Sequence, residues 1–328
     1  MWKFIVKRLA LSVVILFFVS LILYTVMRCI PTSFVDSMAR QLSMQPNAKS
    51  FDEWKIQLNE IYHLDGTILE GYFGWLGNAV RGDFGDSWYY IVPVTEKFKD
   101  VIWYSFALGA ISFVLELVIA IPLGILAAKK QYSGVDYAVT VVALVGISLP
   151  TFFFATILKY IFSIKLGWLD LYGIVGRFYE QLTPMGKLLD MGKHMMMPIV
   201  TLVIVSIGSL MRYTRTNMLE VMNSDFIRTA RAKGLSEKTV INKHAFRNTL
   251  IPIVTLVGGS LPGLFSGAMI TETLFQIPGI GYISYNAMTN GDINFYMFYS
   301  VFLAILTLLG TLIADILYAV VDPRVRIN

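Results

Sequence analysis

The chain is poor in the residues that metal proteins and soluble enzymes depend on. Its 328 residues include one cysteine, three histidines and only 15% charged residues. Cys29 by itself excludes an intrachain disulfide and a multi-cysteine metal site. The histidines (His63, His194 and His244) have no metal-ligand spacing, so we predict no metal site and interpret each of them as a solvated or interfacial side chain.

Sequence motifs for nucleotide binding and hydrolysis are missing as well. Gly186-Lys187 and Gly192-Lys193 lack the first glycine and the following Ser or Thr of a phosphate-binding loop. HExxH is absent, and no serine and histidine fall on facing apolar runs. We therefore predict that the chain is not an enzyme and holds no cofactor. If ATP and Mg²⁺ drive it, another chain binds them.

Apolar residues, in contrast, are abundant. They make up 56% of the chain, aromatics make up 14%, and the mean hydropathy is +0.63. This composition predicts an integral membrane protein with an all-α fold. The net charge of +5 does not indicate nucleic-acid binding, because the basic residues are spread over loops between apolar runs.

Six apolar runs are long enough to cross a bilayer. Pro122 and Pro150 are expected to kink the second and third runs. The predicted organisation is a cytoplasmic start with the first span (1–30), an extracytoplasmic segment with short interfacial helices (31–100), and a transmembrane core (101–328). The runs are 9–27, 101–128, 137–164, 195–211, 250–270 and 295–321.

The loop charges predict the orientation. The two termini and the loops on their side hold fifteen Lys and Arg against five acids, whereas the opposite loops hold ten against fourteen. Because cytoplasmic loops carry the excess of basic residues, both termini are expected in the cytoplasm.

The longest polar interruption of the core is the segment 224–252. Ser224 is expected to cap a helix with Phe226 and Ala230 on one side, Gly234 to permit a sharp turn, and Ser236 to begin a second helix. Two short helices of this polarity do not cross a bilayer. They are expected to lie on the membrane surface, held by anionic lipid, or in a groove of a partner protein.

Several charges fall inside the apolar runs. Arg28 and Lys159 lie near run ends and are expected to snorkel to the interface. Glu116 lies deeper in its run. It is equally expected to line a pathway or to pair with another group. For Glu272 and Asp315, orienting a loop or capping a helix is favoured over touching substrate.

The segment Pro278-Gly279-Ile280-Gly281 supplies a rigid turn followed by two flexible points, in a turn-rich loop expected over 271–281. We interpret it as part of an outer gate or of a docking surface for an extracytoplasmic binding protein. Pro278, Gly279 and Gly281 therefore join Glu116, Glu272 and Asp315 as candidates for a pathway or gate.

RTARAKGLSE (228–237) and HAFRNTLIP (244–252) resemble the cytoplasmic signature loop of ABC-importer permeases. The likeness is greatest to the first permease subunit of the oligopeptide, dipeptide and nickel uptake systems, and it covers nearly the whole chain. Further strings that carry it, in order, are WLGNAVRGDFGDSW (75–88), IPLGILAAKK (121–130), SLPTFF (148–153) and ETLFQIPGIG (272–281).

The resemblance implies a type I ABC-importer permease fold with six transmembrane helices and a coupling helix in 224–252. The expected docking core is Arg228, Thr229, Ala230, Ala232 and Gly234, with Arg231 and Lys233 available for charged contacts. Three features depart from the family pattern. Arg228 stands where the broader signature has glutamate, Gly234 is further from Pro252 than in many importers, and Pro31-Thr32-Ser33 replaces a Pro-Gly-Asp.

The resemblance also implies the partners and the location. They are a second homologous permease, two cytoplasmic ATPase subunits, an extracytoplasmic solute-binding protein and membrane lipid, in the bacterial inner membrane. Short peptides are the expected substrate, and nickel or a nickel chelate is the alternative. An ion-coupled secondary transporter, with Glu116, Glu272 or Asp315 as proton sites, and an intramembrane enzyme are less favoured classes.

Overall fold

The protein is almost entirely helical in the computed structural model, which describes residues 2–30, 34–46 and 48–321. The all-α prediction is therefore confirmed. Pro31-Thr32-Ser33 and the tail 322–328 lie outside the described residues. The helices are α1 (Trp2–Cys29), α2 (Phe34–Ser43), α3 (Phe51–Ile61), α4 (Ile68–Ala79), α5 (Val94–Lys129), α6 (Gly134–Ser148), α7 (Thr151–Leu158), α8 (Pro184–Met222), α9 (Asp225–Ala232), α10 (Glu237–Thr239), α11 (Phe246–Ser260), α12 (Met269–Phe275), α13 (Ile280–Thr289) and α14 (Ile293–Val321).

Short irregular elements join these helices. The π-helical turn η1 (Lys159–Lys165) extends α7, and the π-helical turn η3 (Val240–Ala245) precedes α11. The 3₁₀ turns are η2 (Tyr179–Gln181) and η4 (Leu261–Phe265). The antiparallel strands β1 (Asp86–Ser87) and β2 (Val92–Pro93) lie just before α5.

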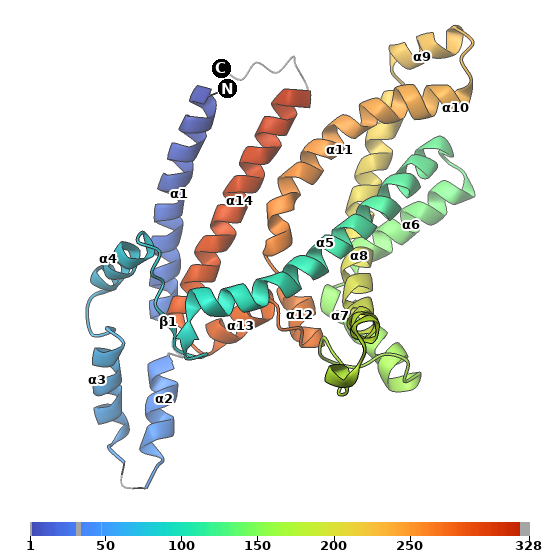
Figure 1. Cartoon of the computed structure of the whole chain (residues 1–328). Helices are drawn as coiled ribbons and strands as arrows, with labels where there is room; N and C mark the ends of the chain where they lie inside the picture. Colours follow the sequence, from blue (N-terminus) through green and yellow to red (C-terminus); the bar gives the residue numbers. More distant parts are fainter. Residues whose placement is uncertain (1, 31–33, 47, 322–328) are drawn as a thin grey trace.

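Four described helices are long and apolar enough to cross a membrane, namely α1, α5, α8 and α14. The number rises to six if α6 with α7, and the helices on either side of Pro252, each count as one bent span. In Figure 1 the beginning of α1, the end of α14 and α9 lie at one end of the molecule, and α2 and α3 lie at the other. This arrangement matches six alternating spans.

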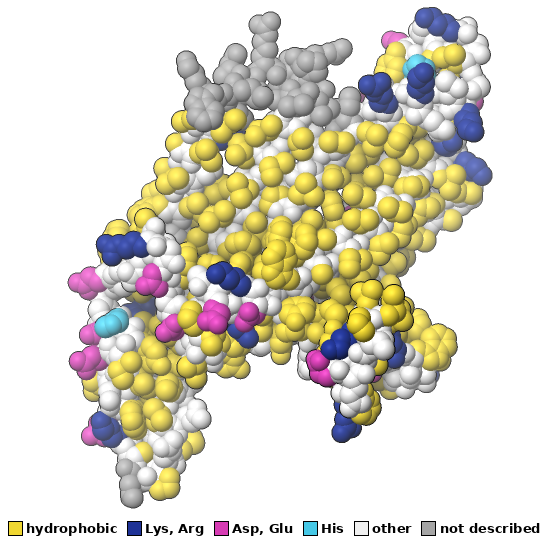
Figure 2. Space-filling view, viewed as in Figure 1, with side chains coloured by type: hydrophobic (Ala, Val, Ile, Leu, Met, Phe, Trp, Pro, Cys, Tyr) yellow, Lys and Arg dark blue, Asp and Glu magenta, His cyan; other side chains and the backbone are white. Residues whose placement is uncertain are grey.

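The two ends of the molecule differ in charge. Figure 2 shows apolar side chains covering the middle, Lys and Arg around α9 and α10, and most of the visible Asp and Glu at the opposite end. The segment with α2, α3 and α4 carries many of those acids. The charge asymmetry of the sequence is therefore also a polarity of the folded molecule.

The third span is broken more sharply than predicted. α6 ends at Ser148, α7 begins at Thr151, and their axes differ by 103°. Leu149 is extended because the ring of Pro150 disfavours a helical conformation in the residue before it. The chain thus turns back at Pro150 instead of continuing as a kinked helix.

Small residues allow the close packing of α11 and α14. A side-chain carbon on Gly310 would collide with the carbonyl oxygen of Gly259. This agrees with the sequence, where the glycine-rich fifth run predicts close approach between helix backbones.

The predicted loop over 271–281 is largely helical, so that prediction is wrong. Most of it belongs to α12 and the first turn of α13. Between them Gln276 adopts a left-handed conformation, with φ of 52°, and ends α12. This brings the beginning of α13 back against α12.

Candidate functional site

The candidate coupling helix α9 packs one face on its own chain. Ile227 and Ala230 are 0% and 7% exposed and share a buried cluster with Met218 of α8 and Ala128 of α5. Phe226 is 47% exposed, so the predicted pairing of Phe226 with Ala230 on one face is wrong. The buried positions are instead Ile227 and Ala230, three residues apart on the helix.

The opposite face of α9 is open. The exposed residues of α9 are Asp225, Phe226, Arg228, Thr229, Arg231 and Ala232, and the chain stays exposed from Lys233 through Leu235. The Arg228 side chain is 72% exposed, and its ion pair with Asp225 is long, at 3.4 Å. Of the predicted docking core, only Ala230 is unavailable to a partner, because it faces the chain itself.

The turn after α9 forms as the sequence predicts. Gly234 has φ of +76°, a left-handed conformation in which glycine is favoured. Across this turn the Arg231 guanidinium donates two hydrogen bonds to the Glu237 carboxylate, at 2.8 and 3.1 Å. The pairing raises the pKa of Arg231. Arg231 is therefore engaged within the chain, whereas Lys233 remains open.

The two serines before the short helices behave differently. Ser236 Oγ accepts from the backbone N–H of Thr239 at 3.3 Å, as a helix cap does. Ser224 occupies the equivalent place before α9, but its hydroxyl donates to the carbonyl oxygen of Val221 at 2.6 Å. Ser224 thus fastens α9 to the end of α8.

A buried ion pair lies at the same end of the molecule. Arg215 of α8 donates to both carboxylate oxygens of Asp136, at 2.7 and 2.8 Å, and Asp136 is 3% exposed. The pair fixes the beginning of α6 against the end of α8. Sequence reasoning missed it because the two residues are 79 positions apart and neither belongs to a motif.

Glu272 is the centre of a second buried site. It is 0% exposed, and its carboxylate accepts hydrogen bonds from Ser105 Oγ at 2.7 Å, Ala268 N at 2.9 Å and Tyr282 N at 3.0 Å. These donors come from α5, from the residue before α12 and from α13. Glu272 therefore joins three elements, which agrees with its predicted orienting role.

The segment Pro278-Gly279-Ile280-Gly281 closes over this carboxylate. A side-chain carbon on Gly279 would lie 2.5 Å from Glu272 Oε2 and from Ser105 Oγ, and one on Gly281 would lie 2.8 Å from the Met269 backbone. Neither glycine has a positive φ. Close approach, and not the flexibility predicted from the sequence, explains why glycine suits both positions.

Lys159 does not snorkel to a membrane interface as predicted. It is 9% exposed, its Nζ donates to the Leu274 carbonyl oxygen at 2.6 Å, and it lies 3.9 Å from the centre of the Tyr172 ring. A cation at the carboxyl end of a helix satisfies carbonyl groups that have no partner within that helix. Lys159 thus holds the end of α12 at Leu274, two residues after Glu272.

Arg28 is also bound within the chain. Its guanidinium donates to the carbonyl oxygens of Leu64 at 2.8 Å and Gly66 at 3.1 Å. It therefore links the end of α1 to the loop between α3 and α4.

The remaining two intramembrane acids occupy separate places. Asp315 of α14 forms an ion pair of 2.9 Å with Arg8 of α1, near the end of the molecule that carries α9. Glu116 is half-buried in α5, beside Ser206 of α8. Asp315 is thus paired with another helix instead of orienting a loop or capping a helix, and both alternatives for Glu116 stay predictions. The structure does not bring Glu116, Glu272 and Asp315 together.

One histidine differs from its predicted solvated or interfacial role. The His194 side chain is 2% exposed; its Nδ1 lies 2.8 Å from the Asp190 carbonyl oxygen, and its Nε2 lies 3.4 Å from Asp170. No group of three or more His, Cys, Asp or Glu within residues 2–30, 34–46 and 48–321 is arranged to hold a metal ion.

Comparison with known proteins gives relatives over the full length. The chain is 37% identical to the oligopeptide transport system permease protein AppB of Bacillus subtilis (strain 168), covering 99% of this chain and all of that protein. It is 34% identical to the proteins named OppB of Haemophilus influenzae and Escherichia coli K12, again over 99% of this chain and all of each relative.

A solved structure shares the fold. An inward-facing structure of the MetNI methionine ABC transporter superposes with a TM-score of 0.52 at 16% identity, covering 70% of this chain and 97% of that chain. The family model described as "Binding-protein-dependent transport system inner membrane component" matches residues 120–327, which include α9 and Glu272. The resemblance to importer permeases is thereby confirmed, and the chain belongs to the family of inner membrane components of binding-protein-dependent transport systems.

Proposed function

We propose that the chain is a permease subunit of an ATP-driven importer of short peptides. The observation that carries this proposal is the full-length similarity to proteins named as oligopeptide transport permeases. The excess of basic residues at the α9 end supports an orientation with both termini and α9 in the cytoplasm. The segment with α2, α3 and α4 then lies outside the cell.

In this function the open face of α9 is the contact for a cytoplasmic ATPase subunit. Arg228, Thr229, Ala232 and Lys233 are exposed for this contact, while Ile227 and Ala230 anchor the helix to α5 and α8. Since a buried, close-packed cluster transmits displacement, movement of α9 would move the ends of those two spans. A helix that only rested on lipid would have no need of such an anchor.

The complete importer contains two ATPase subunits, a second homologous permease and an extracytoplasmic binding protein. The chain itself performs no hydrolysis and converts closure of the ATPases into a change in the pathway. The Glu272 cluster serves as a rigid joint on the outer side, because its contacts connect α12 to α5 and to α13.

Reconstituted transport tests the proposal. Proteoliposomes that hold the chain with its co-expressed permease and ATPases should accumulate a labelled tripeptide only with ATP and the binding protein. The same vesicles should not accumulate nickel. Peptide uptake by the chain alone, driven by a proton gradient, would instead establish a secondary transporter and overturn the proposal.

A further inference from the structure

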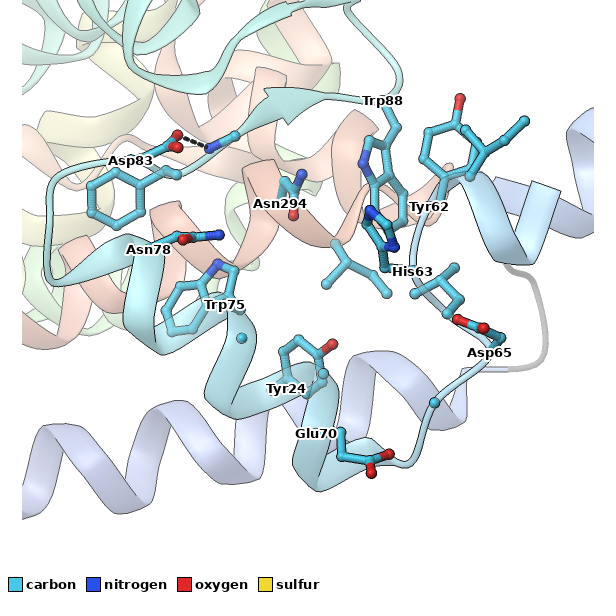
Figure 3. A pocket seen from close by; sticks show the side chains of 18 residues that line it. Tyr24, Tyr62, His63, Asp65, Glu70, Trp75, Asn78, Asp83, Trp88 and Asn294 are labelled. Carbon is cyan, nitrogen blue, oxygen red and sulfur yellow. Dashed lines mark hydrogen bonds between the residues drawn. The ribbon is translucent and has the colours of Figure 1, made fainter. Parts of the chain in front are cut away.

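A cavity of about 460 Å³ lies at the end of the molecule opposite α9. It opens to the surface and is lined by the end of α1, the loop between α3 and α4, helix α4, the segment 83–88 and the beginning of α14 (Figure 3). The proposed coupling and transport steps make no use of it. The family match begins at residue 120, so most of the residues that line this cavity precede it.

The walls of the cavity are aromatic. Tyr24, Tyr62, Trp75 and Trp88 line it, and Figure 3 shows the rings of Trp75 and Trp88 on opposite sides with Asn294 between them. Aromatic faces attract apolar groups and also cations, through the negative potential of the ring. The walls therefore suit an apolar stem that carries a positive charge.

The charges around the cavity have one sign. Asp65, Glu70 and Asp83 line it, and no Lys or Arg is among its lining residues. Figure 3 places Asp65 and Asp83 at opposite sides of the pocket. The nearby guanidinium of Arg28 already donates to two wall carbonyls, those of Leu64 and Gly66. These carboxylates would repel an anionic ligand, and no basic group of the lining would offset the repulsion.

One acid of the lining has unused hydrogen-bonding capacity. The Asp65 carboxylate makes no hydrogen bond or ion pair with any described residue, whereas Glu70 is occupied by the N–H and hydroxyl of Thr67. Asp65 is exposed, so a ligand in the cavity can reach it. An ammonium group would give this carboxylate a charge-assisted hydrogen bond.

We propose that this cavity binds a protonated amine on an apolar stem. The ammonium group lies toward Asp65, and the stem lies between the rings of Trp75 and Trp88. The amino-terminal residue of a short peptide has this chemistry, as does a free amino acid amide. The identification of a peptide as the ligand rests on the proposed function, whereas the amine site itself does not.

Binding of phenylalaninamide to the full-length chain in lipid nanodiscs tests the proposal, with empty nanodiscs correcting for partition into lipid. N-acetylphenylalaninamide keeps the stem but has no charge. Phenylalaninamide is expected to bind at least about tenfold more tightly than the acetylated compound, because a hydrogen bond to a charged group is lost.

Two variants locate the site. Asp65→Asn should weaken the binding of phenylalaninamide about tenfold. The control Asp52→Asn, at an exposed position of α3 outside the lining, should leave this binding unchanged. Trp75→Ala removes one aromatic wall and should weaken the binding of phenylalaninamide, whereas Trp103→Ala, at an exposed position of α5, should leave it unchanged. Size-exclusion profiles show that each variant is folded.

The results separate the possible ligands. Tight binding of Phe-Gly-Gly identifies a peptide end as the source, and binding of the amide without the peptide identifies a free amine; both support the amine site. Equal binding of the charged and acetylated compounds, or full binding by Asp65→Asn, would overturn it. Because no ATP or partner is present, this experiment can fail while the proposed transport function holds.

Discussion

Ser105 and Glu272 are joined by a hydrogen bond of 2.7 Å that links α5 to α12 inside the protein. The same Ser105 oxygen accepts from the backbone N–H of Ile280, also at 2.7 Å. One hydroxyl therefore acts as donor and acceptor between three helices. Since the cluster is fully buried, water cannot replace either contact.

Ser105→Ala should lower the stability of the chain by about 1 to 3 kcal/mol, because it leaves the Ile280 N–H and one Glu272 oxygen short of a partner. Ser112→Ala is the matched control, since Ser112 is also buried on α5 but its hydroxyl has no partner among the described residues. Thermal unfolding of the two purified variants measures the difference. Equal midpoints would show that the Ser105 contacts do not hold these helices together.

The two faces of α9 should respond differently to truncation. Ile227→Ala removes a fully buried side chain and should cost about 2 to 5 kcal/mol of stability. Phe226→Ala removes an exposed one and should change the stability by less than about 0.5 kcal/mol while weakening the association with ATPase subunits. Unfolding midpoints and the amount of co-purified ATPase distinguish the two effects. If Phe226→Ala left ATPase association intact, this face would not be the contact.

Gly234 should tolerate asparagine better than alanine. A side-chain carbon at Gly234 meets nothing within 4 Å, so the cost of alanine is conformational, about 1 to 2 kcal/mol at a positive φ. Asparagine adopts this conformation more readily. The rate of trypsin cleavage within 224–252 should therefore follow the order Ala, then Asn, then Gly, from fastest to slowest.

Gly263→Ala is the control for this series, because Gly263 also has open space around it but no positive φ. It should leave the cleavage rate unchanged. The same rate for Gly234→Ala and Gly263→Ala would mean that the left-handed turn does not limit opening of the segment.

The sequence predicted the local features of this protein well. The apolar runs, the glycine turn at Gly234 and the helix starting after Ser236 each depend on neighbouring residues, and hydrophobic length and turn preference act at that range. The order of motifs also sufficed to identify the family. The face of α9 was mispredicted because helix periodicity allows both Phe226 and Ile227 to pair with Ala230, and only the packing of α5 and α8 selects Ile227.

The features that were missed depend on contacts between different elements of the fold. Lys159 and Arg28 looked like ordinary snorkelling residues, since the carbonyl groups that bind them belong to Leu274, Leu64 and Gly66. The two glycines around Ile280 looked flexible because the carboxylate that excludes a side chain there is contributed by α12. Such requirements arise from tertiary contacts, for which a single sequence carries no local signal.

Asp292 provides a prediction for the dependence of stability on pH. It precedes α14, is 0% exposed, and accepts hydrogen bonds from Ser87 Oγ and the backbone N–H groups of Tyr89 and Phe295. Burial raises the pKa of this carboxyl above its ordinary value, and the hydrogen bonds offset part of the rise. The folded chain thus binds this proton more tightly than the unfolded chain.

The contribution of Asp292 to the free energy of unfolding should therefore fall as the pH rises from about 3.9, the pKa of an unperturbed aspartate, through its folded value. The unfolding midpoint of the wild type minus that of Asp292→Asn should be larger at pH 4.5 than at pH 8. Asp86→Asn, exposed on β1, controls for the loss of one charge. A difference that instead grew with pH would mean that the hydrogen bonds from Ser87, Tyr89 and Phe295 outweigh burial and hold the carboxylate in its charged form.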